Sequence, residues 1–561
     1  MKTTKFILSF ILCMVFYFNA ASAFSASYPN GNKEEIKVIS TTERALSFTF
    51  SGITKESVVK NMLDQLDDMG IIGTFFVFEI EMNRYPNILR EIIARGHEIG
   101  LAIGPKAEDD ADKTKAAIIA NAQKLKNLFG VDIKFVKQPF GAVNENTLKA
   151  VSDLGYYFIG QSVNVVQAKH RDYTSAEKVI PELFGRFRHS LSRGDIVHFR
   201  MDYYTNENLI IDLIKAVKKL KIDNIAYATT FDNPQDNPKN DSWYIIKPVS
   251  QVLFNEKYTW KYPIDEKDII KSLAVDGPTF KFDDSTLMNE IVKRNIGTPT
   301  VTIDNRMVGF TSKDAKEIDY SGKVKTHDNA VFFTFDDWGT DAAVNKLLYV
   351  LKKHNIKATF YIITRTVEGN KNLLRSIAMD GHEIGSHTHL HSPMAVLGKK
   401  GKYVRTQNYE EMLEDFSTSF KILRSIVGDV SFEGRPVLVR HFRPPTMAIS
   451  KDGLKALFNS GFEYIIGGSE SSGDYEAPST SFLTNKLRAG LFEMNGSVQK
   501  GAVVVMHMSD TSVYTAMTVD IFLQANEAKA DDDPSKFKQS ILADYLINDY
   551  NQMDKNFVQL K

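Results

Sequence analysis

Four side chains in the second half of this 561-residue chain have the types and spacing needed for metal chemistry. Asp336 and Asp337 are adjacent carboxylates that directly follow an apolar run, and His387 and His391 are imidazoles four positions apart. Two His nitrogens and one Asp oxygen suit a divalent ion such as zinc and leave a coordination position open for water. The pattern therefore predicts a metal site with three protein ligands. The remaining carboxylate would then be free to act as a base.

The chain repeats the sequence around these residues. Three blocks recur in the same order: ALSFTFSG at 45–52 and AVFFTFDD at 330–337, GHEIG at 96–100 and 381–385, and LKA at 148–150 and 454–456. The first two pairs are offset by 285 positions and the third by 306. Several blocks in one register indicate an internal duplication. The change in offset places an insertion of 21 residues in the second copy, which we expect within 392–440.

The duplication separates residues that serve the fold from residues that serve chemistry. Both copies keep GHEIG and a His after a late apolar strand, namely His198 and His507. Only the second copy has the four residues of the predicted metal site. Their counterparts in the first copy are Ser51, Gly52, Ala102 and Lys106. The first copy is therefore expected to lack every metal ligand.

Length and charge restrict the class of protein. The chain is long enough for two large domains, and its formal net charge is zero. No basic stripe stands out, so the sequence predicts no nucleic-acid partner.

The N-terminus has the layout of a cleavable secretory signal over residues 1–23. Lys2 and Lys5 precede the apolar run 6–18, which ends near the small residues 21–23. The alternative is an uncleaved N-terminal anchor. A signal predicts a periplasmic or secreted protein whose mature chain has no transmembrane segment. The single cysteine, Cys13, lies within this signal, so any metal must be held by His and carboxylate groups.

Apolar runs typical of strands alternate with amphipathic stretches in both copies. The expected strands are 45–50, 73–78, 196–199, 330–335, 359–363 and 503–506, and the expected helices are 55–68, 87–95, 342–354 and 372–379. This alternation predicts an α/β fold with a parallel sheet in each copy, either a βα barrel or a doubly wound sheet. The candidate site residues follow strands, and active sites of such folds lie at the carboxyl ends of the strands.

Domain boundaries follow from the same pattern. The first copy is expected over 34–235, ending in a strand at 225–229, and the second over 326–561, with 557–560 as the matching strand. Residues 236–325 are expected to be a linker or a small inserted region. Within it, 300–308 could form a β-hairpin, and the Asn-, Asp- and Pro-rich stretch before it is typical of a linker.

The second copy resembles the polysaccharide deacetylase family, whose catalytic unit is called the NodB homology domain. The resemblance rests on five segments in the family's order: TFDD at 334–337, HTHLH at 387–391, RPP at 443–445, DY at 474–475 and VMH at 505–507. It implies two tandem irregular (β/α) barrels, with the first one degenerate. It also implies a divalent metal ion, most often zinc, and hydrolysis of N-acetyl groups on a glycan.

The resemblance also implies a role for each matching residue at the metal. Asp337, His387 and His391 would be the metal ligands, and Asp336 the general base that takes a proton from water. His387 and His391 share one face if their segment is helical, and His389 then points elsewhere, toward a neighbouring group or the surface. His382 has the counterpart His97 in the copy without ligands, so we interpret it as structural.

The other matching residues would surround the reacting group. Arg443 would orient the base and line the groove, and its counterpart in the first copy is Lys137. His507 would be the general acid, although its counterpart His198 leaves open a purely structural role. Asp474 would hold His507, with Glu470 as the rival carboxylate.

Pro445 and Tyr475 would contact the substrate. The chain departs from the family here, because Thr446 and Met447 follow the prolines where the family commonly has an aromatic residue and Gly. Tyr475 stands where the family often has Trp. The groove wall is therefore expected to differ.

The function expected from these residues is metal-dependent removal of N-acetyl groups from a glycan or polysaccharide. Two alternatives remain: an O-acetyl polysaccharide esterase that uses the same site, and a non-catalytic glycan-binding protein. The intact residues Asp336, Asp337, His387 and His391 favour an enzyme. The sequence does not identify the polymer.

Overall fold

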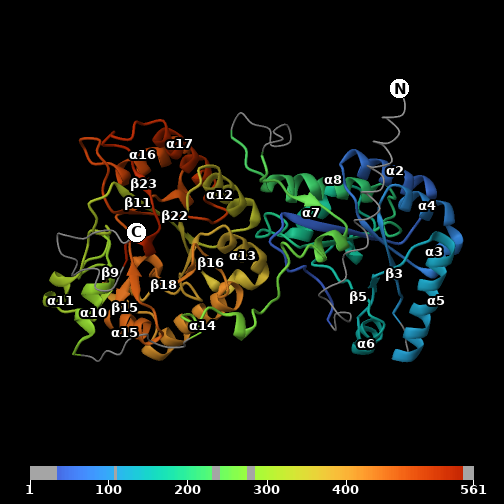
Figure 1. The fold of residues 1–561 in the computed structure, drawn as a ribbon, viewed down its shortest axis with the longest axis horizontal. Coiled ribbons are helices and arrows are strands. Elements are labelled where there is room, and N and C mark those ends of the chain that lie inside the picture. The colour runs from blue at the N-terminus through green and yellow to red at the C-terminus, as the bar shows by residue number, and fades with distance from the viewer. Residues whose placement is uncertain (1–33, 106–109, 230–239, 275–284, 547–561) are drawn as a thin grey trace, which may run out of the picture.

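A computed structural model describes residues 34–105, 110–229, 240–274 and 285–546. The predicted signal over 1–23, the counterpart residue Lys106, and the strand expected at 557–560 lie outside these ranges. Figure 1 shows two lobes side by side, the N-terminal one in blue to green and the C-terminal one in yellow to red.

The N-terminal lobe is built on a parallel sheet. Its strands are β1 (Ala45–Ser51), β2 (Thr74–Val77), β3 (Glu98–Ala102), β4 (Phe135–Lys137), β5 (Tyr157–Phe158), β6 (Val163–Asn164), β7 (Ile196–Arg200) and β8 (Ile245–Ile246). They follow the order β5-β4-β3-β2-β1-β7-β6, and β8 also pairs with β1. The helices that cover it are α2 (Glu56–Asp68), α3 (Glu79–Arg84), α4 (Pro86–Ala94), α5 (Ala111–Phe129), α6 (Glu145–Asp153), α7 (Ala176–Phe184), α8 (Leu209–Lys221) and α9 (Val249–Leu253).

The C-terminal lobe repeats this arrangement. Its parallel sheet follows the order β21-β22-β11-β12-β13-β18-β20-β9, and β23 also pairs with β11. The strands are β9 (Asn295–Ile296), β11 (Ala330–Asp337), β12 (Thr359–Ile362), β13 (Glu383–Ser386), β18 (Leu438–Phe442), β20 (Tyr464–Ile466), β21 (Glu470–Ser471), β22 (Ala502–His507) and β23 (Lys538–Gln539). Its helices are α10 (Leu287–Arg294), α11 (Ser312–Glu317), α12 (Asp341–Lys353), α13 (Lys371–Met379), α14 (Tyr409–Val427), α15 (Lys451–Asn459), α16 (Thr480–Leu491) and α17 (Thr515–Glu527).

The predicted α/β class and the two tandem irregular barrels are confirmed. In each lobe the strands run parallel, and the terminal strands of the sheet order do not pair with each other in the described ranges, so each barrel is open. Apart from the strand expected at 225–229, the predicted strands and helices within the described ranges match the observed ones to within about two residues at each end, which is the usual uncertainty of such boundaries.

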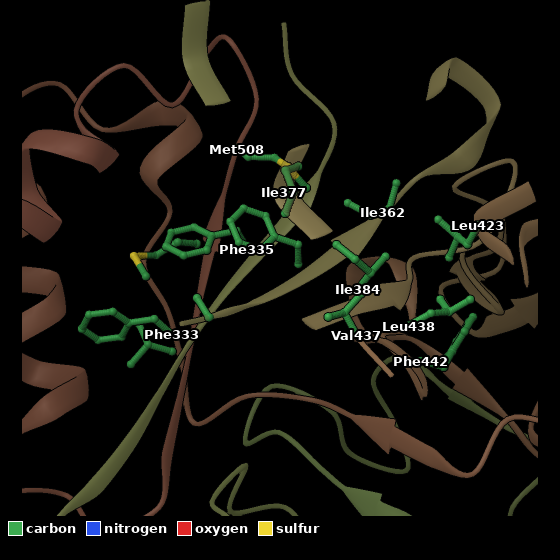
Figure 2. Close-up of a cluster of buried hydrophobic side chains, with 14 of the residues drawn as sticks. Phe333, Phe335, Ile362, Ile377, Ile384, Leu423, Val437, Leu438, Phe442 and Met508 are labelled. Atoms are coloured by element: carbon green, nitrogen blue, oxygen red, sulfur yellow. The ribbon is translucent and has the colours of Figure 1, made fainter. Parts of the chain in front are cut away.

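The central strand β11 separates two apolar layers. Phe333 and Phe335 face the helices and pack with Ile384 and Leu438 in the cluster of Figure 2, where all four are buried. Phe332 faces the other way, into the barrel, among a smaller buried cluster. Because side chains alternate along a strand, Thr334 and Asp336 share the inward face with Phe332. The sequence of β11 therefore aims a carboxylate into the upper end of the barrel.

The insertion in the second copy consists of two short hairpins. Helices α5 and α14 both have 19 residues, and their offset is 298. Thirteen residues are therefore added before α14 and eight after it. The first addition carries the hairpin of β14 (Ala395–Leu397) and β15 (Tyr403–Arg405), and the second that of β16 (Ser431–Phe432) and β17 (Arg435–Pro436). The predicted location within 392–440 agrees with both.

The strand predicted at 225–229 was wrong. Residues Asp223–Ile225 form a 3-10 turn, and 226–229 form no strand. The strand that pairs with β1 at this place is β8, as β23 pairs with β11 in the C-terminal lobe. A two-residue strand carries no periodic signal, so sequence patterning does not find it.

The described parts of segment 236–325 are shared between the lobes. Strand β8 joins the first sheet, whereas β9 joins the second, and Figure 1 places α10 and α11 against the C-terminal lobe. Residues 300–308 form a tight turn with one antiparallel bridge, Thr302 to Asn305, rather than the predicted hairpin. The strand β10 (Met307–Val308) that follows pairs in parallel with β19 (Ile449–Ser450) instead.

A buried polar network joins the two lobes. Arg193 of the first lobe pairs with Asp341 at the start of α12 at 2.8 Å, and both side chains are almost fully buried. Tyr244 donates a hydrogen bond to the same carboxylate. Asn372 on α13 donates to the carbonyl oxygens of Ile39 and Arg193, both at 2.8 Å. These contacts hold the lobes in one orientation, because a buried charge that loses its partner is costly.

No helix within the described ranges is long and apolar enough to span a bilayer.

Candidate active site

The site lies where β11, β12 and β22 end together. Asp336 is the register partner of His507 on one side and of Tyr361 on the other. Asp337 is the last residue of β11 and has a φ of 77°, so the chain turns sharply at this point. Because of this turn, the two adjacent carboxylates have different neighbours, and Asp336 is directed into the barrel.

Asp337, His387 and His391 meet at one point, as the sequence predicted. The Oδ1 atom of Asp337 lies 3.6 Å from the Nε2 atom of each imidazole. One ligand atom from each of the three residues lies within 4.8 Å of the others. Such spacing suits coordination of one ion, because Zn–N and Zn–O bonds are about 2.0–2.2 Å long.

Residues 387–391 form no helix, so a shared helix face does not bring the two imidazoles together. This segment is a loop after β13, and both Thr388 and His391 have positive φ, at 69° and 59°. Asp415 on α14 fixes the loop, because its Oδ1 accepts hydrogen bonds from the backbone N–H groups of His389 and Leu390 at 2.7 and 3.0 Å. The two imidazoles therefore converge through a looped backbone instead of a shared helix face.

The hydrogen bonds of His387 fit a metal ligand. Its Nδ1–H donates to the backbone carbonyl of Arg443 at 2.8 Å, which leaves the lone pair of Nε2 directed at the cluster. Burial and the nearby His391 lower the pKa of His387 to about 3, so the ring is neutral. Metal-binding histidines are commonly held in this way through the second ring nitrogen. His389 instead directs Nδ1 to the Thr364 hydroxyl at 3.1 Å.

Arg443 holds the buried carboxylate of Asp336. Its Nη1 donates to Asp336 at 2.8 Å and to the Thr334 hydroxyl at 2.6 Å. The rest of the guanidinium donates to the carbonyl oxygens of Ile466 and Gly467. Burial raises the pKa of Asp336 above its usual value despite the attraction of Arg443 and His507. A carboxylate with a raised pKa is a stronger proton acceptor once ionised.

His507 and Asp474 form a second polar pair on the other side of Asp336. The His507 Nδ1 lies 2.7 Å from Asp474 Oδ1, and the His507 backbone N–H donates to Oδ2 at 2.8 Å. The Thr515 hydroxyl also donates to Oδ2, at 2.6 Å. Burial lowers the pKa of His507, but the hydrogen bond and charge of Asp474 outweigh it and raise the pKa to about 9. The imidazole is therefore protonated at neutral pH.

The structure places Asp474, and not the rival Glu470, beside His507. Burial raises the pKa of Glu470 and the charge of Lys486 on α16 lowers it, so Glu470 interacts with α16 and not with His507. Tyr475 stacks edge-on against His507, with 4.9 Å between the ring centroids, and is 45% exposed. An aromatic ring that is half in solvent beside a proton donor is suited to contact a substrate.

The segment after Arg443 forms the opposite wall. Pro445 is buried, and Thr446 and Met447 both have positive φ, at 54° and 61°. Arg306 donates to the Thr446 carbonyl at 3.0 Å and so ties the middle segment to this wall. Backbone geometry rather than an aromatic side chain shapes the wall at these two positions.

Several supporting residues were missed by the sequence reasoning. These are Thr334, Asp415, Thr515 and Tyr361, whose ring lies under the Arg443 guanidinium at 4.4 Å. Thr334 could have been identified from the sequence, because it stands two residues before Asp336 on the same face of a strand. The other three come from distant elements, and their spacing carries no signal.

In the first lobe, the positions that correspond to the site residues hold side chains that pack or hydrogen-bond inside the lobe. His198 lies between Thr49 and Ser51, with both ring nitrogens 3.1 Å from a hydroxyl oxygen. Asp202 fills the space beside Gly52, since a Cβ at position 52 would lie 2.2 Å from its Oδ1 atom. Lys137 is buried and donates to the Gly160 carbonyl at 2.8 Å. Of the three predicted ligand positions, the two within the described residues hold Gly52 and Ala102, and Ser51 stands in place of Asp336.

His97 and His382 have the same role in the two lobes. Each accepts a hydrogen bond at Nδ1 from a backbone N–H, of Gly73 and Ala358 respectively, at 3.2 Å. Both rings are buried beside a phenylalanine. The interpretation of His382 as structural agrees with this geometry.

Comparison with known proteins gives one family. The sequence profile described as "Polysaccharide deacetylase" matches residues 39–159 and 323–465. The peptidoglycan-N-acetylglucosamine deacetylase of Bacillus cereus is 28% identical over 177 residues, which cover 32% of this chain and 55% of that protein. The chain thus spans about half the length of this relative.

Two further proteins are similar. The chitooligosaccharide deacetylase of Sinorhizobium fredii is 26% identical over 195 residues, which cover 34% of this chain and 79% of that protein. The solved structure of Bacillus subtilis PdaA, a family 4 carbohydrate esterase, matches 40% of this chain and 86% of its own at 19% identity, with a TM-score of 0.30. The polysaccharide deacetylase profile thus matches in both lobes, so the two copies found in the sequence are similar to the same family.

Proposed function

We propose that the C-terminal lobe is a metal-dependent hydrolase that removes N-acetyl groups from a glycan, and that the N-terminal lobe is catalytically silent. One observation carries this proposal: three metal-ligating side chains converge beside two differently tuned proton-transfer groups, Asp336 and His507. Two relatives, a peptidoglycan-N-acetylglucosamine deacetylase and a chitooligosaccharide deacetylase, support the same substrate class.

Asp337, His387 and His391 would hold the ion, with zinc as our choice because Asp and His ligands suit it. When bound, a divalent ion supplies Lewis-acid chemistry, which polarises a carbonyl oxygen and makes water more acidic. Arg443 orients both parts of the site, because its guanidinium holds Asp336 and its backbone carbonyl holds the His387 ring.

Asp336 is the proposed general base. Its carboxylate is fixed by Arg443 and faces into the barrel end beside the ligand cluster. It accepts a proton from the attacking water while the water oxygen bonds to the acetyl carbon. General-base assistance of this kind is typically worth about 10²–10⁴-fold in rate.

His507 is the proposed general acid. Its Nδ1 is occupied by Asp474, so Nε2 is the nitrogen that can donate a proton to the leaving group. As the C–N bond breaks, the amine nitrogen takes this proton and the acetyl group leaves as acetate. The raised pKa of His507, about 9, keeps the proton available at neutral pH.

This protonated imidazole favours N-acetyl over O-acetyl substrates. An amine leaves only with proton help, whereas an alkoxide leaving group of an ester needs less help. The O-acetyl esterase function is therefore our second candidate, since it uses the same ligands and the same base.

We also propose a location outside the cytoplasm, either periplasmic or secreted. The support is the charge and apolar pattern of residues 1–23. Intact mass of the exported protein tests it: an N-terminus near Phe24 is expected, and an exported form that still begins at Met1 would contradict cleavage.

The proposed function is tested by acetate release from a panel of matched N- and O-acetylated glycans. Metal-loaded wild-type protein should release acetate from an N-acetylated member. Release from O-acetylated members alone would establish the esterase instead. Binding to these glycans without any release would favour the non-catalytic alternative. Asp336→Asn protein serves as the matched control for contaminating esterases.

A further inference from the structure

A second hollow opens beside His507, between the two lobes. Its volume is about 230 Å³, and it lies between α12, the segment that follows β22, and two residues of the N-terminal lobe. His507, Asp510 and Thr515 line it on one side, Lys346 on α12 on another, and His189 on a third. The cavity is therefore continuous with the proposed general acid but distinct from the three metal ligands.

Lys346 brings an unpaired positive charge to this cavity. Its side chain is half-buried on α12, and no ion pair involves it among the described residues. Burial lowers the pKa of its ammonium group, and Asp510 is the charge that acts against this. Buried or half-buried ammonium groups are normally paired, since burial without a partner is unfavourable. An anionic group in the cavity would supply the missing partner.

Asp510 lines the same cavity, but no ion pair joins its carboxylate to Lys346 among the described residues. Both of its carboxylate oxygens are occupied by Thr340, with Oδ2 accepting from the backbone N–H at 3.0 Å and Oδ1 from the hydroxyl. The other charged group at the cavity is the protonated His507, whose charge is shared with Asp474 on its far nitrogen. The cavity wall thus offers one ammonium group with free donors.

The N-terminal lobe completes the wall of the cavity, and a hydrogen bond holds it against α12. The Ser190 hydroxyl accepts a hydrogen bond from the Ala342 backbone N–H at 3.0 Å, which fixes the segment that carries His189 against α12. Asn224 donates to the His189 carbonyl at 3.0 Å, and its own Oδ1 is buried without a hydrogen-bond partner. The first lobe, silent in catalysis, therefore supplies part of a surface next to His507.

We propose that this interlobe cavity binds a carboxylate carried by the glycan substrate, with Lys346 as the residue that recognises it. The inference rests on the proposed function, because it assumes that a glycan reaches His507. A carboxylate is favoured over a neutral sugar group because the cavity presents an unpaired ammonium, and hydrogen bonds to a charged partner are roughly twice as strong as neutral ones. Lys346 is thus a specificity residue, while Asp336 and His507 act on the acetyl group.

Two kinds of glycan could carry the carboxylate, a sugar with a lactyl ether or a uronic acid. The test therefore uses N-acetylated oligosaccharides of both kinds, each compared with the same oligosaccharide after conversion of its carboxylate to a methyl amide. This change removes the charge and keeps the chain length. Binding is measured by calorimetry, and kcat/KM is measured from acetate release.

Wild-type protein should favour at least one acid over its amide by roughly tenfold in Kd, the size expected for one charge-assisted hydrogen bond. Lys346→Gln should remove most of that preference, and Lys346→Arg should keep most of it. Lys500→Gln is the charge-matched control, because Lys500 is exposed and donates to the His327 carbonyl away from the cavity.

The outcomes separate this inference from the proposed function. Acetate release with equal affinity for acid and amide would overturn the inference and leave the function standing. A preference for acid that survives in Lys346→Gln would overturn the role of Lys346. If no glycan releases acetate, the function fails, and the calorimetric comparison still decides whether the cavity binds carboxylates. A preference for one of the two acids identifies the source of the carboxylate.

Discussion

Replacing Asp474 by Asn should move the alkaline limb of the pH–rate profile. Asp474 is the main group that raises the pKa of His507 to about 9 against the effect of burial, with smaller contributions from the charges of Asp336 and Asp337. A general acid works in its protonated form, so activity is present below this pKa and is lost as pH rises through it. Without the carboxylate charge, burial remains, and the pKa should fall to the ordinary value of 6.5 or lower.

The size of the effect depends on pH. With a pKa of about 9, His507 is roughly 90% protonated at pH 8, and with a pKa of 6.5 only about 3%. The variant should therefore lose about 30-fold in kcat/KM at pH 8 but less than about twofold from this cause at pH 6. The assay is acetate release between pH 5 and 10, with metal content measured at each end.

Glu470→Gln is the matched control, because Glu470 is the nearby carboxylate that does not contact His507. Its alkaline limb should coincide with that of the wild type. The reasoning is refuted if Asp474→Asn loses activity equally at all pH values, or if its alkaline limb stays near pH 9. Either result would mean that His507 is not the acid that this limb reports.

Three further sets of variants test the metal ligands, the general base and the contact between the lobes. His387→Ala and His391→Ala should each abolish the binding of about one divalent ion per chain, whereas His389→Ala, whose ring faces Thr364, should keep it; metal analysis decides, and full occupancy in His391→Ala would contradict the ligand set. Asp336→Asn should keep the metal and lose about 10²–10⁴-fold in kcat, and loss of the metal would instead make Asp336 a ligand. Asp341→Asn should lower the free energy of unfolding by roughly 3–5 kcal/mol in a denaturant titration, since it leaves Arg193 buried without its partner. Asp241→Asn, which breaks an exposed pair with Lys352, should cost less than about 1 kcal/mol, and equal effects would show that the buried network does not join the lobes.

The fold could be predicted from the sequence because the buried strands and helices of each lobe have regular patterns of apolar residues. Strand β11 is apolar on both faces until Thr334, and α12 repeats apolar residues at helical spacing, so patterning alone located both. The duplication then distinguished Asp336 and Asp337 from their silent counterparts, Ser51 and Gly52. The rule that functional groups follow parallel strands placed these residues together.

Local patterning failed where distant contacts decide the backbone. Four-residue spacing would place His387 and His391 on one face of a helix, but Asp415, more than twenty positions later, holds that segment as a loop. In the first lobe, the Asp202 side chain occupies the space beside Gly52 into which a ligand side chain would extend. Neither contact is visible before the chain is folded.

The contacts between the lobes could not be predicted from the sequence either. Arg193 and Asp341 are separated by 148 positions, and neither stands in a recognisable motif. The same interface brings His189 to a cavity beside His507. Tertiary packing of two similar barrels therefore sets the shape of the surface next to the site.

The central claim is that the ligand cluster of the C-terminal lobe drives deacetylation. It is tested most directly by acetate release from an N-acetylated oligosaccharide with chelator-treated protein, before and after addition of one equivalent of zinc, in wild type and His387→Ala. We predict no release from chelated wild type, recovery with zinc, and no recovery in His387→Ala. Acetate release that persists in chelated protein, or that zinc restores in His387→Ala, would contradict the account.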